Sequence, residues 1–160
     1  MESSRSLVVA LGNPLVGADG FGAAVLERVR AVPGLGEVAD VLDAHTDLVG
    51  QIDRLARYQR VILVDAIVAA GSPGRVGVYE EARFADWPDT SPSCHQISPL
   101  VAIKLLRRLH PGAAPEIVLV SLSVDEVSRD AGVSDETVEA GARFVTHLLG
   151  LPASPLRQLR

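Results

Sequence analysis

The strongest constraint on the fold is an alternation along the chain between short apolar runs and segments with helical spacing. The clearest run, residues 61–64 (VILV), holds four aliphatic side chains, three of them β-branched. Such a run is typical of a strand buried on both faces, as in a parallel sheet. Residues 7–11 and 117–122 have the same character. The sequence therefore predicts buried strands at these three places.

The segments between these runs carry apolar residues three or four positions apart, which is the period of a helix packed on one face. They span residues 21–29, 48–56, 97–109 and 134–149. Ser134 suits the N-cap of the last helix, and Asp135 and Glu136 suit its positive end.

Two further strands complete the pattern. Residues 38–42 predict another strand, and residues 75–80 predict a hairpin-like addition near an edge. Residues 84–93, with two prolines, are typical of an irregular surface loop. We expect an α/β fold: a three-layer sandwich, with a mostly parallel twisted sheet of about five strands and helices on both faces.

The length of 160 residues suits one domain with a sizeable core. We expect a single domain over residues 1–150, followed by a flexible tail over 151–160, where Pro152 and Pro155 interrupt any regular structure. The chain is 48% hydrophobic and shows neither an internal repeat nor a linker.

Charge and composition exclude several classes of partner. The net charge is −5, and only Lys104 among the 15 basic residues is a lysine, so no basic patch for nucleic acid or anionic lipid is expected. No run approaches the roughly 18–20 apolar residues of a membrane helix. Cys94 is the only cysteine, which excludes an intramolecular disulfide. We expect a cytoplasmic protein that contacts neither membrane nor nucleic acid.

A glycine-rich loop, residues 12–22, follows the first strand and carries Asp19. It lacks the Gly-Lys-Ser/Thr of a phosphate-binding loop and the order of a dinucleotide fingerprint. Asp19 is expected at or just before the first turn of the next helix. It could be an N-cap stabilised by the helix dipole, or a functional carboxylate, since ligands gather beyond the carboxyl ends of parallel strands.

Two other residues occupy comparable junctions. Asp65 follows the apolar run at 61–64, and His95 precedes a predicted helix, whose positive end favours the neutral imidazole. Asp19, Asp65 and His95 would together suit a borderline divalent ion such as Ni²⁺ or Zn²⁺. Their spacing alone does not show this, because no two of them share a helical turn, and each could instead cap a helix or bond to a loop.

The segment at residues 7–26, LVVALGNPLVGADGFGAAVL, resembles the opening of the hydrogenase maturation peptidases: a strand, then Gly-Asn-x-Leu-x-x-Asp-Asp/Glu-Gly-x-Gly, then a helix. Three further segments follow in the order that is typical of the family: VILVDAI, SPGRVGVY and SCHQISPL. They match Asp65 to the acidic position of the family's pattern and His95 to its histidine position. The resemblance covers residues 7 to about 110.

The resemblance implies a metal-dependent endopeptidase of aspartyl or metallopeptidase type, which removes the C-terminal peptide from the precursor of the nickel-iron hydrogenase large subunit. Asp19, Asp65 and His95 would be both the catalytic residues and the metal contacts. The substrate would supply the Ni²⁺, held by the precursor's cysteines, and Cd²⁺ or Zn²⁺ could substitute. Water could be activated by a carboxylate, or the metal could polarise the scissile carbonyl.

The chain departs from the family's pattern at several positions. Ala18 replaces the first acid of the usual pair, which leaves Asp19 as the sole carboxylate there. The common Asp-Gly-Gly-Thr is replaced by residues 43–46 (DAHT), which should stiffen the loop. We hypothesise that His45 faces the same cleft as a substrate contact or extra ligand; a solvated loop histidine is the alternative. Residues 121–124 (SLSV) replace a common Gly-x-x-Pro, and Cys94 is interpreted as a bystander.

Two other functions remain open at this point. A non-catalytic metal- or ligand-binding module could keep the fold without the activity, and Ala18 favours that interpretation. A small nucleotide-binding domain could use the glycine-rich loop, although Asp19 would repel a phosphate.

Overall fold

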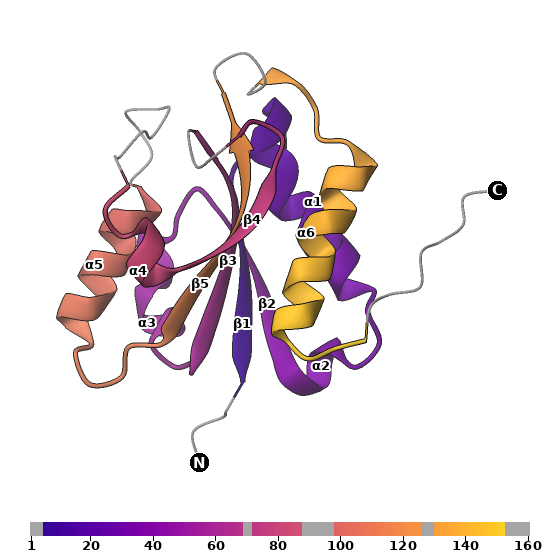
Figure 1. The fold of residues 1–160 in the computed structure, drawn as a ribbon. Helices are drawn as coiled ribbons and strands as arrows, with labels where there is room; N and C mark the ends of the chain where they lie inside the picture. Colours follow the sequence, from indigo (N-terminus) through magenta and orange to yellow (C-terminus); the bar gives the residue numbers. More distant parts are fainter. Residues whose placement is uncertain (1–4, 69–71, 88–97, 126–129, 153–160) are drawn as a thin grey trace.

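One five-stranded sheet forms the centre of the molecule (Figure 1). The computed structural model describes residues 5–68, 72–87, 98–125 and 130–152. The strands lie in the order β2–β1–β3–β5–β4. They are β1 (Ser6–Leu11), β2 (Ala39–His45), β3 (Arg60–Val68), β4 (Val76–Glu80) and β5 (Glu116–Val124). All neighbours pair in parallel except β4, which runs antiparallel to β5.

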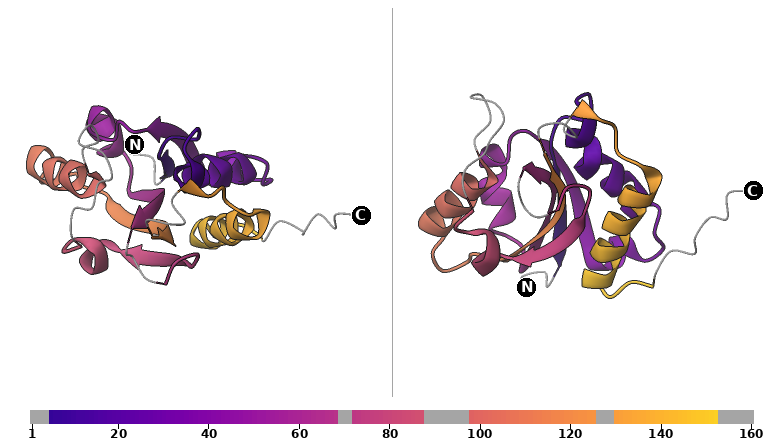
Figure 2. Two further views of the ribbon diagram at one scale, coloured as in Figure 1. Left: turned by 90° about the horizontal axis from the view of Figure 1, so that it is seen from above. Right: turned by 45° about the horizontal axis from the view of Figure 1, so that its top comes forward.

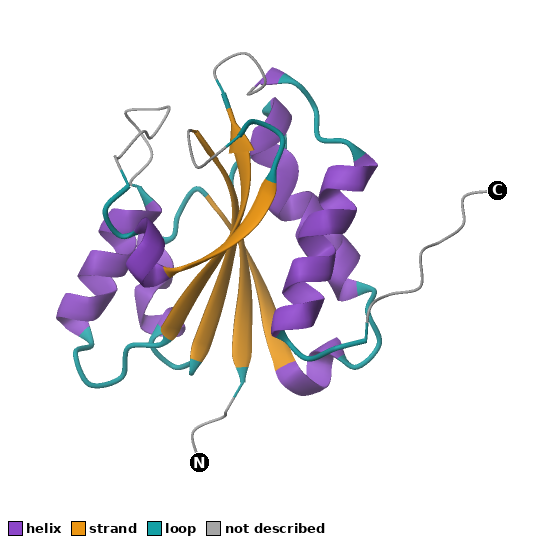
Figure 3. Ribbon diagram, viewed as in Figure 1, coloured by secondary structure: helices purple, strands orange, loops and turns teal. Residues whose placement is uncertain are grey.

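Helices cover both faces of the sheet, as the view from above shows (Figure 2). One face carries α1 (Phe21–Arg30) and α6 (Asp135–Leu148), and the other carries α3 (Ile52–Leu55) and α5 (Pro99–Leu109). Shorter helices and 3₁₀ turns join them (Figure 3): η1 (Gly17–Gly20), α2 (Leu35–Val38), η2 (Val49–Gln51) and α4 (Glu81–Phe84). The three-layer α/β fold predicted from the sequence is therefore confirmed.

The continuous apolar runs are explained by two cores, one on each face. Alternate residues of a strand point to opposite faces. In β3, Ile62 and Val64 pack with α1 and α6, whereas Val61 and Leu63 pack with α3 and α5. All four are at most 1% exposed, so neither face of the strand tolerates a polar residue there.

The edge position of residues 75–80 is confirmed, but their hairpin-like pairing is wrong. β4 does not pair with β3, the strand before it in sequence, because β1 and β5 occupy both edges of β3. It pairs with β5 instead, with Val76 opposite Leu122 and Glu80 opposite Val118. β4 thus covers the outer edge of a strand that comes later in the chain.

The strand order fixes where a ligand can bind. The chain leaves β1 by way of α1 on one face to reach β2, whereas it leaves β3 by way of β4 and then α5, on the other face, to reach β5. The two connections diverge at the carboxyl ends of β1 and β3, which lie side by side. In open α/β sheets this switch point is where ligands bind.

Two helices, α5 and α6, begin with a serine whose side chain caps the first turn. The Ser134 hydroxyl accepts a hydrogen bond from the Thr137 N–H at 3.2 Å, as predicted, and Ser98 caps α5 in the same way through the N–H of Leu100. Within the described ranges, no helix is both long and apolar enough to cross a membrane.

Helix α1 lies so close to the sheet that its second residue must be glycine. A Cβ on Gly22 would lie 2.5 Å from the carbonyl oxygen of Leu11 and 2.6 Å from that of Val64. Both oxygens belong to central strands and cannot move aside cheaply.

We predict that Gly22→Ala lowers the free energy of unfolding by about 3 kcal/mol, because the helix must shift off two main-chain carbonyls. The control is Gly36→Ala in α2, where a Cβ meets nothing within 4 Å and stability should hold or rise slightly. Urea unfolding measures both. Equal stabilities for the two variants would contradict the close contact.

Candidate active site

Asp19 is held over the end of β1 by the glycine-rich loop. It lies in η1, directly before α1, where the sequence placed it. The N–H of Asn13 donates to its Oδ2 at 2.7 Å. Gly12 turns the chain with a φ of 105°, and a Cβ there would lie 2.2 Å from the carbonyl oxygen of Asp19. The loop therefore folds back on itself and fixes the half-buried carboxylate above the strand end.

Asp65 lies inside β3 rather than after it, so the predicted strand end is corrected. β3 continues to Val68 because β5 pairs with it over its full length, with Ser121 opposite Asp65. Pairing with β1 ends earlier, at Ala10 opposite Val64. Asp65 is thus the first residue of β3 beyond its pairing with β1. Asp65 is only 9% exposed to solvent.

The two carboxylates interact electrostatically. The pKa of the Asp65 carboxyl is raised to about 8, chiefly by burial and also by the negative charge of Asp19, while a hydrogen bond from the Ala66 N–H opposes both. η1 also packs against β3, which brings the loop of Asp19 to the strand of Asp65. The structure therefore brings together two of the three predicted site residues. A proton or a cation at this place relieves the repulsion between them.

His95 and Cys94 fall in residues 88–97, outside the described part of the chain, so their placement stays a prediction. Helix α5, which begins shortly after them, starts at the carboxyl edge of the sheet (Figure 1). Among the described residues no three His, Cys, Asp or Glu side chains form a metal-binding group. A three-ligand site at this edge therefore needs a contribution from residues 88–97 or from the substrate.

His45 ends β2 at the same edge and has a left-handed backbone, with a φ of 51°. Its carbonyl accepts a hydrogen bond from the Gly12 N–H at 2.7 Å. The imidazole is 63% exposed, and its Nδ1 lies 3.5 Å from Asp43 Oδ1. A left-handed backbone is strained for residues other than glycine, so His45 occupies a position that glycine would fill at lower cost.

Sequence analysis missed Ser121, which lies opposite Asp65 in β5. Its hydroxyl is fully buried. The signal was the alternation of Ser121 and Ser123 within an otherwise apolar strand, because both serines then share one face of the sheet.

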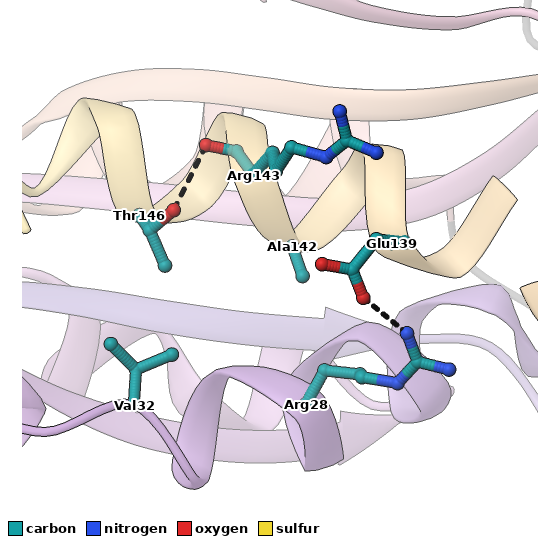
Figure 4. A pocket seen from close by; sticks show the side chains of 6 residues that line it. All are labelled: Arg28, Val32, Glu139, Ala142, Arg143 and Thr146. Carbon is teal, nitrogen blue, oxygen red and sulfur yellow. Dashed lines mark hydrogen bonds and ion pairs between the residues drawn. The ribbon is translucent and has the colours of Figure 1, made fainter. Parts of the chain in front are cut away.

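A small hollow lies between α1 and α6, away from this edge (Figure 4). Its volume is about 30 Å³, room for little more than a water molecule. Arg28 bridges the two helices there through ion pairs with Glu139 and Asp135. This hollow is a helix contact rather than a substrate site.

The fold and the site define an open α/β-sheet protein with two neighbouring carboxylates, Asp19 and Asp65, at its switch point. The family model described as hydrogenase maturation protease (HycI) matches residues 24–150, and the chain belongs to that family. Its proteases cleave the C-terminal extension of the hydrogenase large subunit. The matched segment contains Asp65 and His95 but begins after Asp19.

Solved structures show the same fold. A solution structure of an endopeptidase from Escherichia coli is 21% identical with a TM-score of 0.74, over 96% of this chain and 99% of that one. The hydrogenase maturating endopeptidase HYBD from E. coli is 20% identical with a TM-score of 0.69, over 91% and 92%. A [NiFe] hydrogenase maturation protease HybD from Thermococcus kodakarensis is 23% identical with a TM-score of 0.66, over 91% and 99%. No protein with a curated description matches the sequence.

The raised pKa of Asp65 predicts how stability depends on pH. Between its ordinary value of 3.8 and about 8, the folded protein holds a proton on Asp65 that the unfolded chain releases. The free energy of unfolding should therefore fall as pH rises through this window, by up to roughly 1 kcal/mol per pH unit. Asp65→Asn removes this dependence and should become progressively more stable than the unmodified protein as pH rises. Urea unfolding between about pH 5 and 8 tests it; a constant difference would contradict it.

Proposed function

We propose that this protein is the endopeptidase that removes the C-terminal extension from the nickel-loaded precursor of a nickel-iron hydrogenase large subunit, in the cytoplasm. The observation that carries the proposal is the pairing of Asp19 and Asp65 at the switch point, in a chain of this protease family. The nickel belongs to the substrate, and the protease recognises the bound nickel before it cleaves the precursor.

In this proposal Asp19, Asp65 and His95 contact the metal. Carboxylate oxygens and an imidazole nitrogen suit a borderline divalent ion, and Cd²⁺ or Zn²⁺ can stand in for Ni²⁺. The repulsion that raises the pKa of Asp65 supports this role, because a cation between the two carboxylates removes it. Three ligands leave coordination positions for the precursor's cysteine thiolates.

Contact with the metal places the precursor's scissile bond at the carboxyl edge of the sheet. Water adds to the carbonyl carbon, the C–N bond breaks, and the departing amine takes a proton. Two routes to activate the water fit the site: a carboxylate acting as base, or the metal polarising the carbonyl. In either route Asp19 and Asp65 bind the metal and thereby position the scissile bond beside it.

We predict that Asp19→Asn weakens Cd²⁺ or Zn²⁺ binding at least about tenfold and abolishes processing of nickel-loaded precursor, because it removes the one acid left in its motif. Thermal shift and calorimetry measure the binding, and mass spectrometry detects the released peptide. Asp53→Asn is the control. Asp53 faces an imidazole, with 2.9 Å between its Oδ1 and His110 Nε2, but His110 directly follows the last residue of α5, away from the carboxyl edge.

The same experiment separates the alternatives. Metal binding that depends on Asp19, with no peptide released from a verified cognate precursor, indicates a non-catalytic metal-binding module. A thermal shift with nucleotide and none with metal indicates a nucleotide-binding domain. Equal metal affinity in Asp19→Asn and Asp53→Asn would overturn the proposed site.

We further propose that His45 contacts the precursor, since its exposed imidazole lies at the same edge as Asp19. His45→Gly and His45→Asn both tolerate a left-handed backbone and remove the imidazole. We predict slower processing by both variants, with folding stability within about 1 kcal/mol of the unmodified protein. His147→Ala, an exposed histidine in α6, is the control. Unchanged processing by both His45 variants would show that His45 is only a solvated loop residue.

A further inference from the structure

A row of three residues crosses the sheet beside the paired carboxylates. Asp65 of β3 lies opposite Ser121 of β5, and Ser121 lies opposite Gly77 of β4. Residues directly opposite each other in a sheet point to the same face, so the Ser121 hydroxyl shares the face of the Asp65 carboxyl. On the amino side this face is apolar, with Leu63 and Leu119 packed in the core under α3 and α5.

The Ser121 hydroxyl is buried without a hydrogen-bond partner. Its residue is 0% exposed, and its Oγ meets no donor or acceptor among the described residues. Buried hydroxyls almost always find a partner, because leaving one unpaired costs free energy. An orphaned hydroxyl at this position therefore needs an explanation, and an apolar residue would fill the space more cheaply.

Among the described residues, the strand register places Ser121 between one glycine and one carboxylate. Towards β4 it faces Gly77, which has no side chain. The phenol of Tyr79 lies over that glycine, where a Cβ would be 2.8 Å from the Tyr79 Oη. The Tyr79 ring is packed edge-to-face against Trp87, with 4.9 Å between ring centroids. Towards β3 the neighbour is Asp65, one strand spacing of about 5 Å away, and rotation about χ1 can direct the hydroxyl to it.

We propose that Ser121 is a positioning residue, whose hydroxyl donates a hydrogen bond to the Asp65 carboxylate and fixes the orientation in which that carboxylate contacts the substrate's metal. The Ala66 N–H already donates to the same carboxyl. With two donors on its non-coordinating side, the carboxylate presents its remaining lone pairs to the metal. Hydrogen bonds of this kind orient metal ligands and tune their affinity. The inference rests on the proposed function.

This role predicts an unusual combination of effects for Ser121→Ala. Removing an unpaired buried hydroxyl should raise the melting temperature of the metal-free protein by about 3 °C. The same change should weaken Cd²⁺ or Zn²⁺ affinity about tenfold and lower kcat/KM for nickel-loaded precursor. A serine with a purely structural role would lower the melting temperature and leave the metal affinity unchanged.

Two further variants provide the controls. Ser123→Ala removes a second buried hydroxyl from the same strand and face, but Ser123 lies opposite Ile67, so metal affinity should stay unchanged. Ser121→Thr retains the hydroxyl and should keep metal affinity within about threefold of the unmodified protein. Calorimetric titration with the metal alone, thermal melts of the metal-free protein and the precursor assay are made on all four proteins.

The outcomes separate this inference from the function on which it rests. If the unmodified protein binds metal and processes precursor, and Ser121→Ala matches it in both, only the role of Ser121 is overturned. Equal losses of metal affinity in Ser121→Ala and Ser123→Ala would overturn it too. If the unmodified protein neither binds metal nor processes precursor, the proposed function fails and the role of Ser121 fails with it.

Discussion

Helix α1 can lie against the sheet as it does only because residue 22 has no side chain. Gly22 lets the helix start directly above the carbonyl oxygens of Leu11 and Val64, the last residues of β1 and β3 that are buried in the apolar core. The turn before the helix is thereby held at the strand ends. Asp19 has little freedom to move away from the strand ends. The N–H of Asn13 donates a hydrogen bond to its carboxylate, and Gly12 packs closely against its backbone. A packing constraint between a helix and two strands thus determines the position of a charged group.

The resulting site stores electrostatic free energy. Asp65 is buried next to a second carboxylate and accepts a hydrogen bond from the Ala66 N–H, while the hydroxyl of Ser121, opposite it in β5, is buried without a partner among the described residues. Stability would be greater with apolar residues at both positions, since charges and hydroxyls cost free energy when buried without partners. Functional sites commonly keep such local costs, and the surrounding aliphatic core compensates for them.

Much of this architecture could be predicted from sequence because the apolar runs and helical periods are local signals. The rule that functional residues gather beyond the carboxyl ends of parallel strands also correctly predicted that Asp19 and Asp65 lie at one edge of the sheet. The end of β3 was misplaced because Asp65 breaks the apolar pattern, whereas the strand continues through pairing with β5. The four-residue helices α2 and α4 are shorter than any periodic signal. The partnership of Asp65 with Ser121 depends on strand register, which local patterns do not carry. The position of His95 stays a prediction.

The antiparallel pairing of β4 with β5 also has a consequence for the order of folding. β4 leaves the ribosome before β5, and residues 81–115 separate the two strands. Until β5 is made, β4 has no strand to pair with, and β3 has only β1 beside it. Pairing across such a separation is slow to form, and an unpaired strand edge invites contact with other chains. The carboxyl edge of the sheet, which carries Asp19 and Asp65, is therefore incomplete in the nascent protein until most of the chain has been synthesised.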